Sequence, residues 1–191
     1  IYDWNVVERM AHDRQTRRAA YLSKAQDEFT ALAVRGVYMA GNAAASVVLL
    51  KGLLSAEDTT QLFSGPDGVA LRAALERLGY APQAWGGLSS CTVGGTPLSP
   101  AILREALCAF DPDTIIVCDE AAAQVLREAY ADELAALPDI THAMLDKGVL
   151  VMLLGMRVLN LGGFEASLSD KASKLKMWHA LKQLPALGEP F

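Results

Sequence analysis

VYMAGNAAA (residues 37–45) and TIIVCDEAAA (residues 114–123) share one plan. Each begins with four or five mostly apolar residues, passes through a small turn and continues into alanines. Short apolar runs bounded by turn residues are typical of buried strands, and strands that alternate with helices indicate a mainly parallel sheet. Ligands bind where such strands end, because free backbone N–H groups and helix dipoles meet there. The two segments therefore predict an α/β fold and a ligand site at the edge of the sheet where these strands end.

The rest of the chain continues the alternation of strands and helices. A further strand is predicted over residues 84–93. Residues 148–154 and 156–161 are predicted to form a hairpin, or one strand bent at Gly155. The Ser55–Asp58 spacing indicates a capped short helix, and Ser99-Pro100 supplies an N-cap and a first helical residue. Longer helices are predicted over residues 43–54, 69–78, 99–110, 121–137 and 170–184. We expect an α/β fold with three α/β/α layers and a mainly parallel central sheet of about four strands.

The first 35 residues differ in pattern from the remainder. Residues 6–34 carry apolar positions at helical spacing together with many charges, which predicts an amphipathic helix broken near Asp13 or Arg18. We expect residues 1–35 to form an N-terminal helical arm packed on a single domain of residues 36–191. Arg14 and Arg17, with Arg18, indicate a solvated helix face, and a phosphate contact is the alternative interpretation.

Composition and charge limit the classes of function. Hydrophobic residues make up 52% and charged residues 20% of the 191, which is typical of a globular protein. The formal net charge of -5 provides no general attraction to nucleic acid or anionic membranes, so any nucleic-acid contact needs a local basic patch. The longest apolar run, residues 148–156, is about half of what a membrane span needs. These features predict a cytoplasmic location and no membrane partner.

The cysteines and histidines predict neither a metal site nor a cofactor. Three cysteines lack the spacing of metal ligands, and three histidines share no spacing that favours a metal or a catalytic triad. An iron–sulfur cluster needs four cysteine ligands, which the chain lacks. These residues are Cys91, Cys108, Cys118, His12, His142 and His179.

The order of motifs between residues 34 and 184 resembles the uracil-DNA glycosylase superfamily. In its iron–sulfur and related branches a strand ends in a Gly-Glu-Ala-Pro-Gly type motif, whose place is taken here by GNAAA at residues 41–45. The leucine-bearing helix that ends in glycine is similar to residues 68–79, and the Asp-Pro, strand, Gly-x-x-Ala-Ala segment to residues 111–122. The last family motif, His-Pro-Ser before a lysine-bearing helix, is similar to residues 165–167 and the helix after them.

This resemblance implies a hydrolase of N-glycosidic bonds in DNA repair, with DNA, a nucleobase or a nucleotide as partner. It places Asn42 where water or the base is positioned, and Glu165 or Ser167 near the leaving group. It implies substrate contacts and nucleic-acid contacts from two further sets of residues. The substrate-binding set is Gly41, Ala43, Ser89, Ser90, Asp119, Gly162 and Gly163, and the nucleic-acid-binding set is Lys171 and Lys174.

Departures from the family pattern predict weak, altered or absent base excision. Asn42 replaces an acidic residue, and Glu165 stands where a histidine would donate to the departing base. A carboxylate at that position repels an anionic leaving group unless it is protonated. Phe63 and Tyr38 are the candidates for the aromatic ring that stacks on a flipped base.

Structural roles compete with these assignments, and other functions stay open. Helix capping alone explains Asn42 and Asp119, and a solvated helix face explains Lys171 and Lys174. The fold also suits a non-catalytic interaction or assembly module, in which the arm and residues 149–161 form a homodimer or partner surface. A small-molecule enzyme that uses the same crevice is the third interpretation.

Overall fold

The computed structural model describes residues 4–185, except for the side chains of residues 4–7, 14 and 18. Within these residues six strands form one sheet in the order β1-β3-β2-β4-β6-β5. The four middle strands run parallel, and the edge strands β1 and β5 are antiparallel to their neighbours. The expected mainly parallel sheet is thereby confirmed, but the expected number of about four strands was too low, since the sheet has six. The strands are β1 Met39–Gly41, β2 Val47–Lys51, β3 Trp85–Ser89, β4 Thr114–Val117, β5 Leu150–Leu153 and β6 Met156–Asn160.

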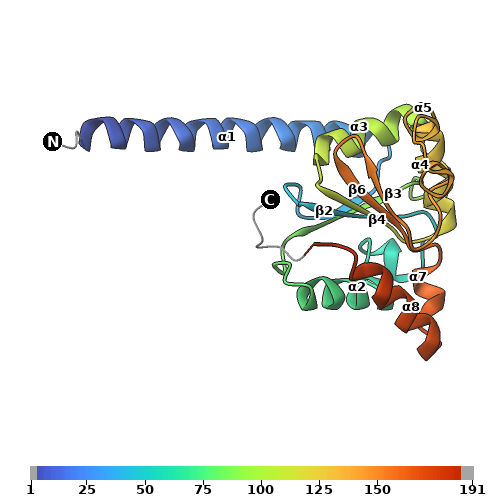
Figure 1. The fold of residues 1–191 in the computed structure, drawn as a ribbon. Helices are drawn as coiled ribbons and strands as arrows, with labels where there is room; N and C mark the ends of the chain where they lie inside the picture. The colour runs from blue at the N-terminus through green and yellow to red at the C-terminus, as the bar shows by residue number, and fades with distance from the viewer. Residues whose placement is uncertain (1–3, 186–191) are drawn as a thin grey trace.

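Helices cover both faces of the sheet, so the fold has three layers (Figure 1). Alternate strand residues face opposite sides: Val48 and Leu50 join one hydrophobic cluster, whereas Val47 and Leu49 join the other. The first cluster includes residues of α1 Trp4–Val34, α3 Pro100–Phe110, α4 Glu120–Ala129 and α5 Ala131–Ala135. The second includes residues of α2 Pro66–Arg77, α7 Phe164–Ser167 and α8 Lys171–Leu181. The short α6 Ile140–Ala143 and a 3-10 turn at Glu57–Thr59 lie in connections.

Strand β2 corrects the predicted helix over residues 43–54, which was wrong. All five residues of Val47–Lys51 are buried and pair with β3, and the first four also pair with β4, at the centre of the sheet. A short apolar run does not distinguish a buried strand from a buried helix by its periodicity. Alanine and leucine favour a helix as single residues, but pairing on both sides overrides that preference here. The alanines at 43–45 belong to the connection before the strand.

Strand β1 lies at an edge of the sheet. It covers Met39–Gly41 and pairs antiparallel with β3, with Gly41 opposite Gly86. The predicted strand at residues 37–40 is therefore present with shifted bounds, but it does not run parallel into the sheet. Its carboxyl end consequently lies beside the amino end of β3.

Several local predictions are confirmed. The Ser99 side chain accepts from the backbone N–H of Ile102, and Pro100 is the first residue of α3. Strands β5 and β6 form the predicted hairpin around Gly155, which has a φ of +81°. The predicted helix at residues 121–137 is interrupted at Tyr130 and forms α4 and α5.

Helix α1 is one continuous helix of 31 residues, so the expected break near Asp13 or Arg18 is absent. Its last turns pack on the domain through Phe29 and Leu32, which are buried. Arg35 follows the helix and forms an ion pair with Glu105 of α3, with 2.6 Å between Nη1 and Oε2. The preceding part of the helix extends away from the domain (Figure 1).

Candidate functional site

Asn42 lies at the amino edge of the parallel strands. Its backbone N–H donates to the carbonyl of Trp85, the first residue of β3, at 3.0 Å. Its side-chain amide donates to Gln83 at 2.9 Å, and its side-chain oxygen accepts from the Ala44 N–H at 3.0 Å. These bonds hold a turn, and no helix begins there.

Asn42 and Glu165 consequently do not share a site. Glu165 follows Phe164, whose N–H donates to Cys118 at the carboxyl end of β4. The length of a parallel strand, roughly 13 Å for five residues, separates the two edges. The neighbours of Asn42, Gly41 and Ala43, instead line a hollow of about 180 Å³ beneath α1.

The carboxyl edge brings together the other predicted site residues. Strand β3 ends at Ser89, strand β4 leads to Asp119, and strand β6 leads to Gly162 and α7. An isolated antiparallel bridge joins Asp119 to Gly163. The edge therefore collects Ser89, Ser90, Asp119, Gly162, Gly163, Glu165 and Ser167.

Backbone donors surround the Asp119 carboxylate. It accepts from Gly52 and Leu53, each at 2.9 Å to Oδ2, and caps α4 by accepting from Ala122 at 2.8 Å to Oδ1. Such a group of N–H donors at a helix N-terminus is the arrangement that binds anions in α/β proteins. Here the protein's own carboxylate, only 8% exposed, occupies it.

Close packing at Gly52 closes the crevice between β2 and β4. A Cβ at Gly52 would lie 2.7 Å from the Ser90 hydroxyl oxygen and 2.9 Å from both the Ala121 Cβ and the Ala122 nitrogen. Parallel α/β sheets bind ligands at this position, because the chain leaves β2 and β4 in opposite directions across the sheet. The described atoms leave no room for a side chain there.

Ser89 and Ser90 are buried beside this contact. The Ser89 hydroxyl oxygen accepts from the Cys91 N–H at 3.1 Å and lies 3.3 Å from the Cys91 sulfur. The Cys91 thiol lies 3.1 Å from the Gly52 carbonyl oxygen, to which it donates. These bonds fix the loop after β3 against the end of β2.

A buried ion cluster continues from the end of β2. Lys51, 2% exposed, places its ammonium 2.6 Å from Oδ2 of Asp58 and 2.6 Å from Oδ2 of Asp67. Asp58 also accepts from the backbone N–H groups of Ser55 and Phe63, each at 2.8 Å. Oδ1 of Asp67 is buried without a hydrogen-bond partner. We refer to Lys51, Asp58 and Asp67 as the ion cluster.

Electrostatics in the ion cluster favour the charged forms of Lys51 and Asp58. Burial alone would lower the pKa of Lys51, but hydrogen bonds to the two carboxylates raise it above its ordinary value. Burial would likewise raise the pKa of Asp58, but Lys51 and the two backbone donors lower it. Lys51 is therefore a protonated structural cation and not a nucleophile.

Glu165 is exposed beside the ion cluster. Partial burial raises the pKa of Glu165, the carboxylates of Asp67 and Asp58 raise it further, and Lys51 opposes them. This shift favours the protonated acid, which is the form that a leaving-group donor requires. The residue predicted to position water, Asn42, is not paired with it, because Asn42 lies at the other edge.

The two candidate stacking rings are held in different ways. Phe63 is fully buried, with its ring centroid 6.4 Å from that of Trp85 and 5.2 Å from the Lys51 ammonium. The Tyr38 hydroxyl donates to the Asp58 carbonyl. Phe63 is therefore closed to a flipped base, and the half-buried Tyr38 has its hydroxyl engaged.

An open hollow of about 300 Å³ lies beside the closed crevice. Lys147 and Lys176 are exposed on its lining, and the Lys147 stem lies over Gly162, where a Cβ would meet it at 2.4 Å. Ser167 also lines it, but its hydroxyl donates to the Phe164 carbonyl at 2.5 Å. We call this the basic hollow; it is lined by Lys147, Leu161, Gly162, Gly163, Ala166, Ser167, Ser173, Lys176 and Met177.

Lys171 and Lys174 are both exposed on α8. Lys174 lines a smaller hollow of about 100 Å³ with Ser167 and Trp178, and this hollow adjoins the basic hollow, since Ser167 and Met177 line both. The Arg77 guanidinium lies 5.7 Å from the centroid of the Trp178 ring on the same side of the sheet. The nucleic-acid-binding set therefore flanks the carboxyl edge without entering the closed crevice.

Sequence reasoning missed the ion cluster and Lys147. Lys51 at the end of an apolar run, followed by Ser55-x-x-Asp58 and Pro66-Asp67, was the available signal. This signal was not sufficient, because the local pattern does not show that the chain turns back and brings these residues together. Helix capping explains Ser55 and Asp58 equally well.

Comparison with known proteins adds no family assignment. No family model matches the chain, and no curated protein matches it. Over residues 4–185 no group of three histidine, cysteine or acidic side chains is arranged to hold a metal ion. In the same range no helix has the length and apolar character to cross a membrane.

Proposed function

We propose that this chain is a uracil-DNA-glycosylase-like domain that binds nucleotide or nucleic-acid phosphate at its carboxyl edge without efficient base excision. The order of motifs supports the family, and the mainly parallel sheet covered by helices on both faces agrees with it. The proposed loss of base excision rests on the separation of Asn42 from Glu165. Hydrolysis needs a group that positions water and a group that donates to the base within one site.

The closed crevice supports the same proposal. A flipped base must enter a pocket at the strand ends, but Asp119 and the Gly52 contact fill this space. The ion cluster further opposes an anionic leaving group, because two carboxylates share one ammonium. Efficient excision would require these groups to move apart.

The basic hollow supplies the binding part of the proposal. Lys147 and Lys176 reach it from two segments, and Gly162 and Gly163 line it with backbone. Lysine side chains bind phosphate as point charges, and this local pair offsets the acidic character of the whole chain. A phosphate group of a nucleotide or of a strand is the ligand that this lining favours.

Binding of labelled oligonucleotides tests this assignment. Fluorescence anisotropy of single- and double-stranded DNA is expected to show salt-sensitive binding, weakened in Lys147→Glu/Lys176→Glu. Lys182→Glu, at the other end of α8, is the matched control with the same change of charge per residue. Equal affinity of the double variant and the wild type would overturn binding at the basic hollow.

Assembly with another chain is a second candidate function, favoured by strand β5. This edge strand is wholly apolar, without proline or charge; Met152 within it is 53% exposed, and Leu154 directly after it is 64% exposed. Open apolar edges pair readily with further strands. Light scattering should then give a dimer mass that Met152→Lys converts to a monomer, and a monomeric wild type at high concentration removes this candidate.

A further inference from the structure

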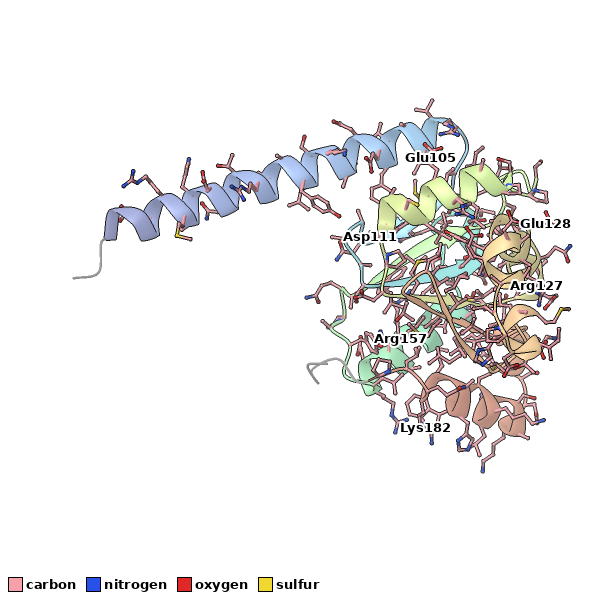
Figure 2. All side chains as sticks on the ribbon, turned by 45° about the horizontal axis from the view of Figure 1, so that its top comes forward. Glu105, Asp111, Arg127, Glu128, Arg157 and Lys182 are labelled. Carbon is pink, nitrogen blue, oxygen red and sulfur yellow. The ribbon has the colours of Figure 1, made fainter. Side chains whose placement is uncertain are left out.

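Residues 8–24 of α1 form a helix that stands free of the domain, which we call the projecting segment. Every described side chain in it is exposed. The whole helix is about 46 Å long at 1.5 Å per residue, and burial begins only at Phe29. Figure 2 shows its side chains surrounding the ribbon without a facing element.

The helix face that packs on the domain continues along the projecting segment. Ala25, Phe29 and Leu32 follow one another at spacings of four and three, and the same spacing leads back to Tyr21, position 18, position 14 and Ala11. Tyr21 and Leu22 remain 58% and 47% exposed on this continuation. In proteins most of the stability of a helix comes from the packing of one face, so a packing face that continues beyond the domain indicates a partner.

Charge identifies the kind of partner. Residues 8–24 hold five lysines and arginines against two acidic residues, whereas the rest of the chain holds 12 against 20. The projecting segment is therefore a basic extension of an acidic protein. Its middle positions 14, 17 and 18 are all arginine, at the helical spacing of three and four.

The same arginines disfavour a second copy of the helix as partner. Pairing of two identical helices along this face would bring the arginines at positions 14 and 18 of one copy against those of the other. Like charges at the centre of such a seam destabilise it. A polyanion removes this repulsion, and arginine binds phosphate through two parallel hydrogen bonds.

We infer that the projecting segment binds the phosphate backbone of nucleic acid, with Arg14, Arg17 and Arg18 as the contacting cations. Tyr21 and Leu22, one turn further along, supply the apolar contact to sugars or bases. This inference extends the proposed function to a second, separate surface. The segment can hold a strand even where the basic hollow binds nothing.

The test compares two sets of variants in the full chain. The probe is a fluorescein-labelled 20-nucleotide DNA, single- and double-stranded, titrated at several salt concentrations. Arg14→Gln/Arg17→Gln/Arg18→Gln keeps good helix formers and should reduce the slope of log affinity against log salt by about two to three. Lys147→Gln/Lys176→Gln reports on the basic hollow, and circular dichroism checks that helix content is retained.

The outcomes separate the two proposals. If the salt dependence of DNA affinity is the same in the arginine triple variant as in the wild type, the inference is overturned. If DNA affinity is at the same time reduced in Lys147→Gln/Lys176→Gln, the proposed function still stands. If DNA affinity and its salt dependence fall in the arginine triple variant but not in the lysine variant, the result supports the inference and counts against phosphate binding at the basic hollow. If light scattering shows a dimer, and the fraction of dimer is larger in the triple variant than in the wild type, two copies of the helix pair with each other. This result also overturns the inference.

Discussion

The Asp119 carboxylate lies 2.9 Å from the backbone nitrogen of Gly52 and thereby joins the ends of the two central strands. Gly52 follows β2, and Asp119 follows β4 by one residue. An internal anion thus fills the position where a parallel sheet offers its N–H groups to a ligand. This relationship connects the fold to the proposed loss of excision.

Removal of that carboxylate should both destabilise the protein and create an anion site. Asp119→Ala leaves the N–H groups of Gly52, Leu53 and Ala122 without their acceptor, which should cost about 1–3 kcal/mol in urea unfolding. Sulfate or phosphate should restore part of this stability by binding the folded state. Asp139→Ala removes an exposed cap and is the control that anions should not rescue. Equal effects of sulfate on both variants would contradict an internal anion at this position.

The ion cluster should respond unequally to single and combined substitution. Lys51→Met leaves two buried carboxylates without their cation and should destabilise the fold by about 3–5 kcal/mol. Lys51→Met/Asp58→Asn/Asp67→Asn removes all the charge and should recover much of that loss. Urea unfolding of both variants measures the difference, and a single variant as stable as the wild type would show that the carboxylates are not held by Lys51.

Stability should depend on pH in both directions through this cluster. The pKa of Asp58 is lowered, so its contribution is present above its unfolded value of about 3.9 and is lost as pH falls through the folded value. The pKa of Lys51 is raised, so its contribution is present below about 10.4 and is lost as pH rises through the folded value. Thermal unfolding between pH 2 and 11 should show both losses in the wild type. If thermal stability depends on pH in the same way in the wild type and in Lys51→Met/Asp58→Asn/Asp67→Asn, the ion cluster is not the origin of the pH dependence.

The crevice at Gly52 should not accept a methyl group. Gly52→Ala places a Cβ within 3 Å of Ser90, Ala121 and Ala122, which should cost about 1–3 kcal/mol through overpacking. Gly94→Ala is the matched control, because its nearest atom lies 3.8 Å from the added carbon. Chemical unfolding of the pair measures the difference; equal stability would indicate a looser edge than the structure has.

Local signals in the sequence predicted those elements whose ends they define. Ser99 and Pro100 mark the start of α3, and the apolar run after Asp113 marks β4. Strand β2 escaped prediction because its residues suit a buried helix equally well, and its pairing with β3 and β4 is not a local property. That single error also moved the site, since it placed Asn42 at the carboxyl edge. Asp119, Gly162 and Gly163 lie at the carboxyl edge as expected, because turn residues directly follow apolar strands there.

Base excision by the wild-type protein is the most direct test of the central claim. Oligonucleotides that carry uracil, hypoxanthine or xanthine, single- and double-stranded, are incubated with the protein and treated with alkali to cleave abasic sites. The proposal predicts binding without cleavage above the background rate. Specific cleavage that disappears in Asn42→Ala would contradict it, because Asn42 would then have to reach the carboxyl edge from which the structure separates it.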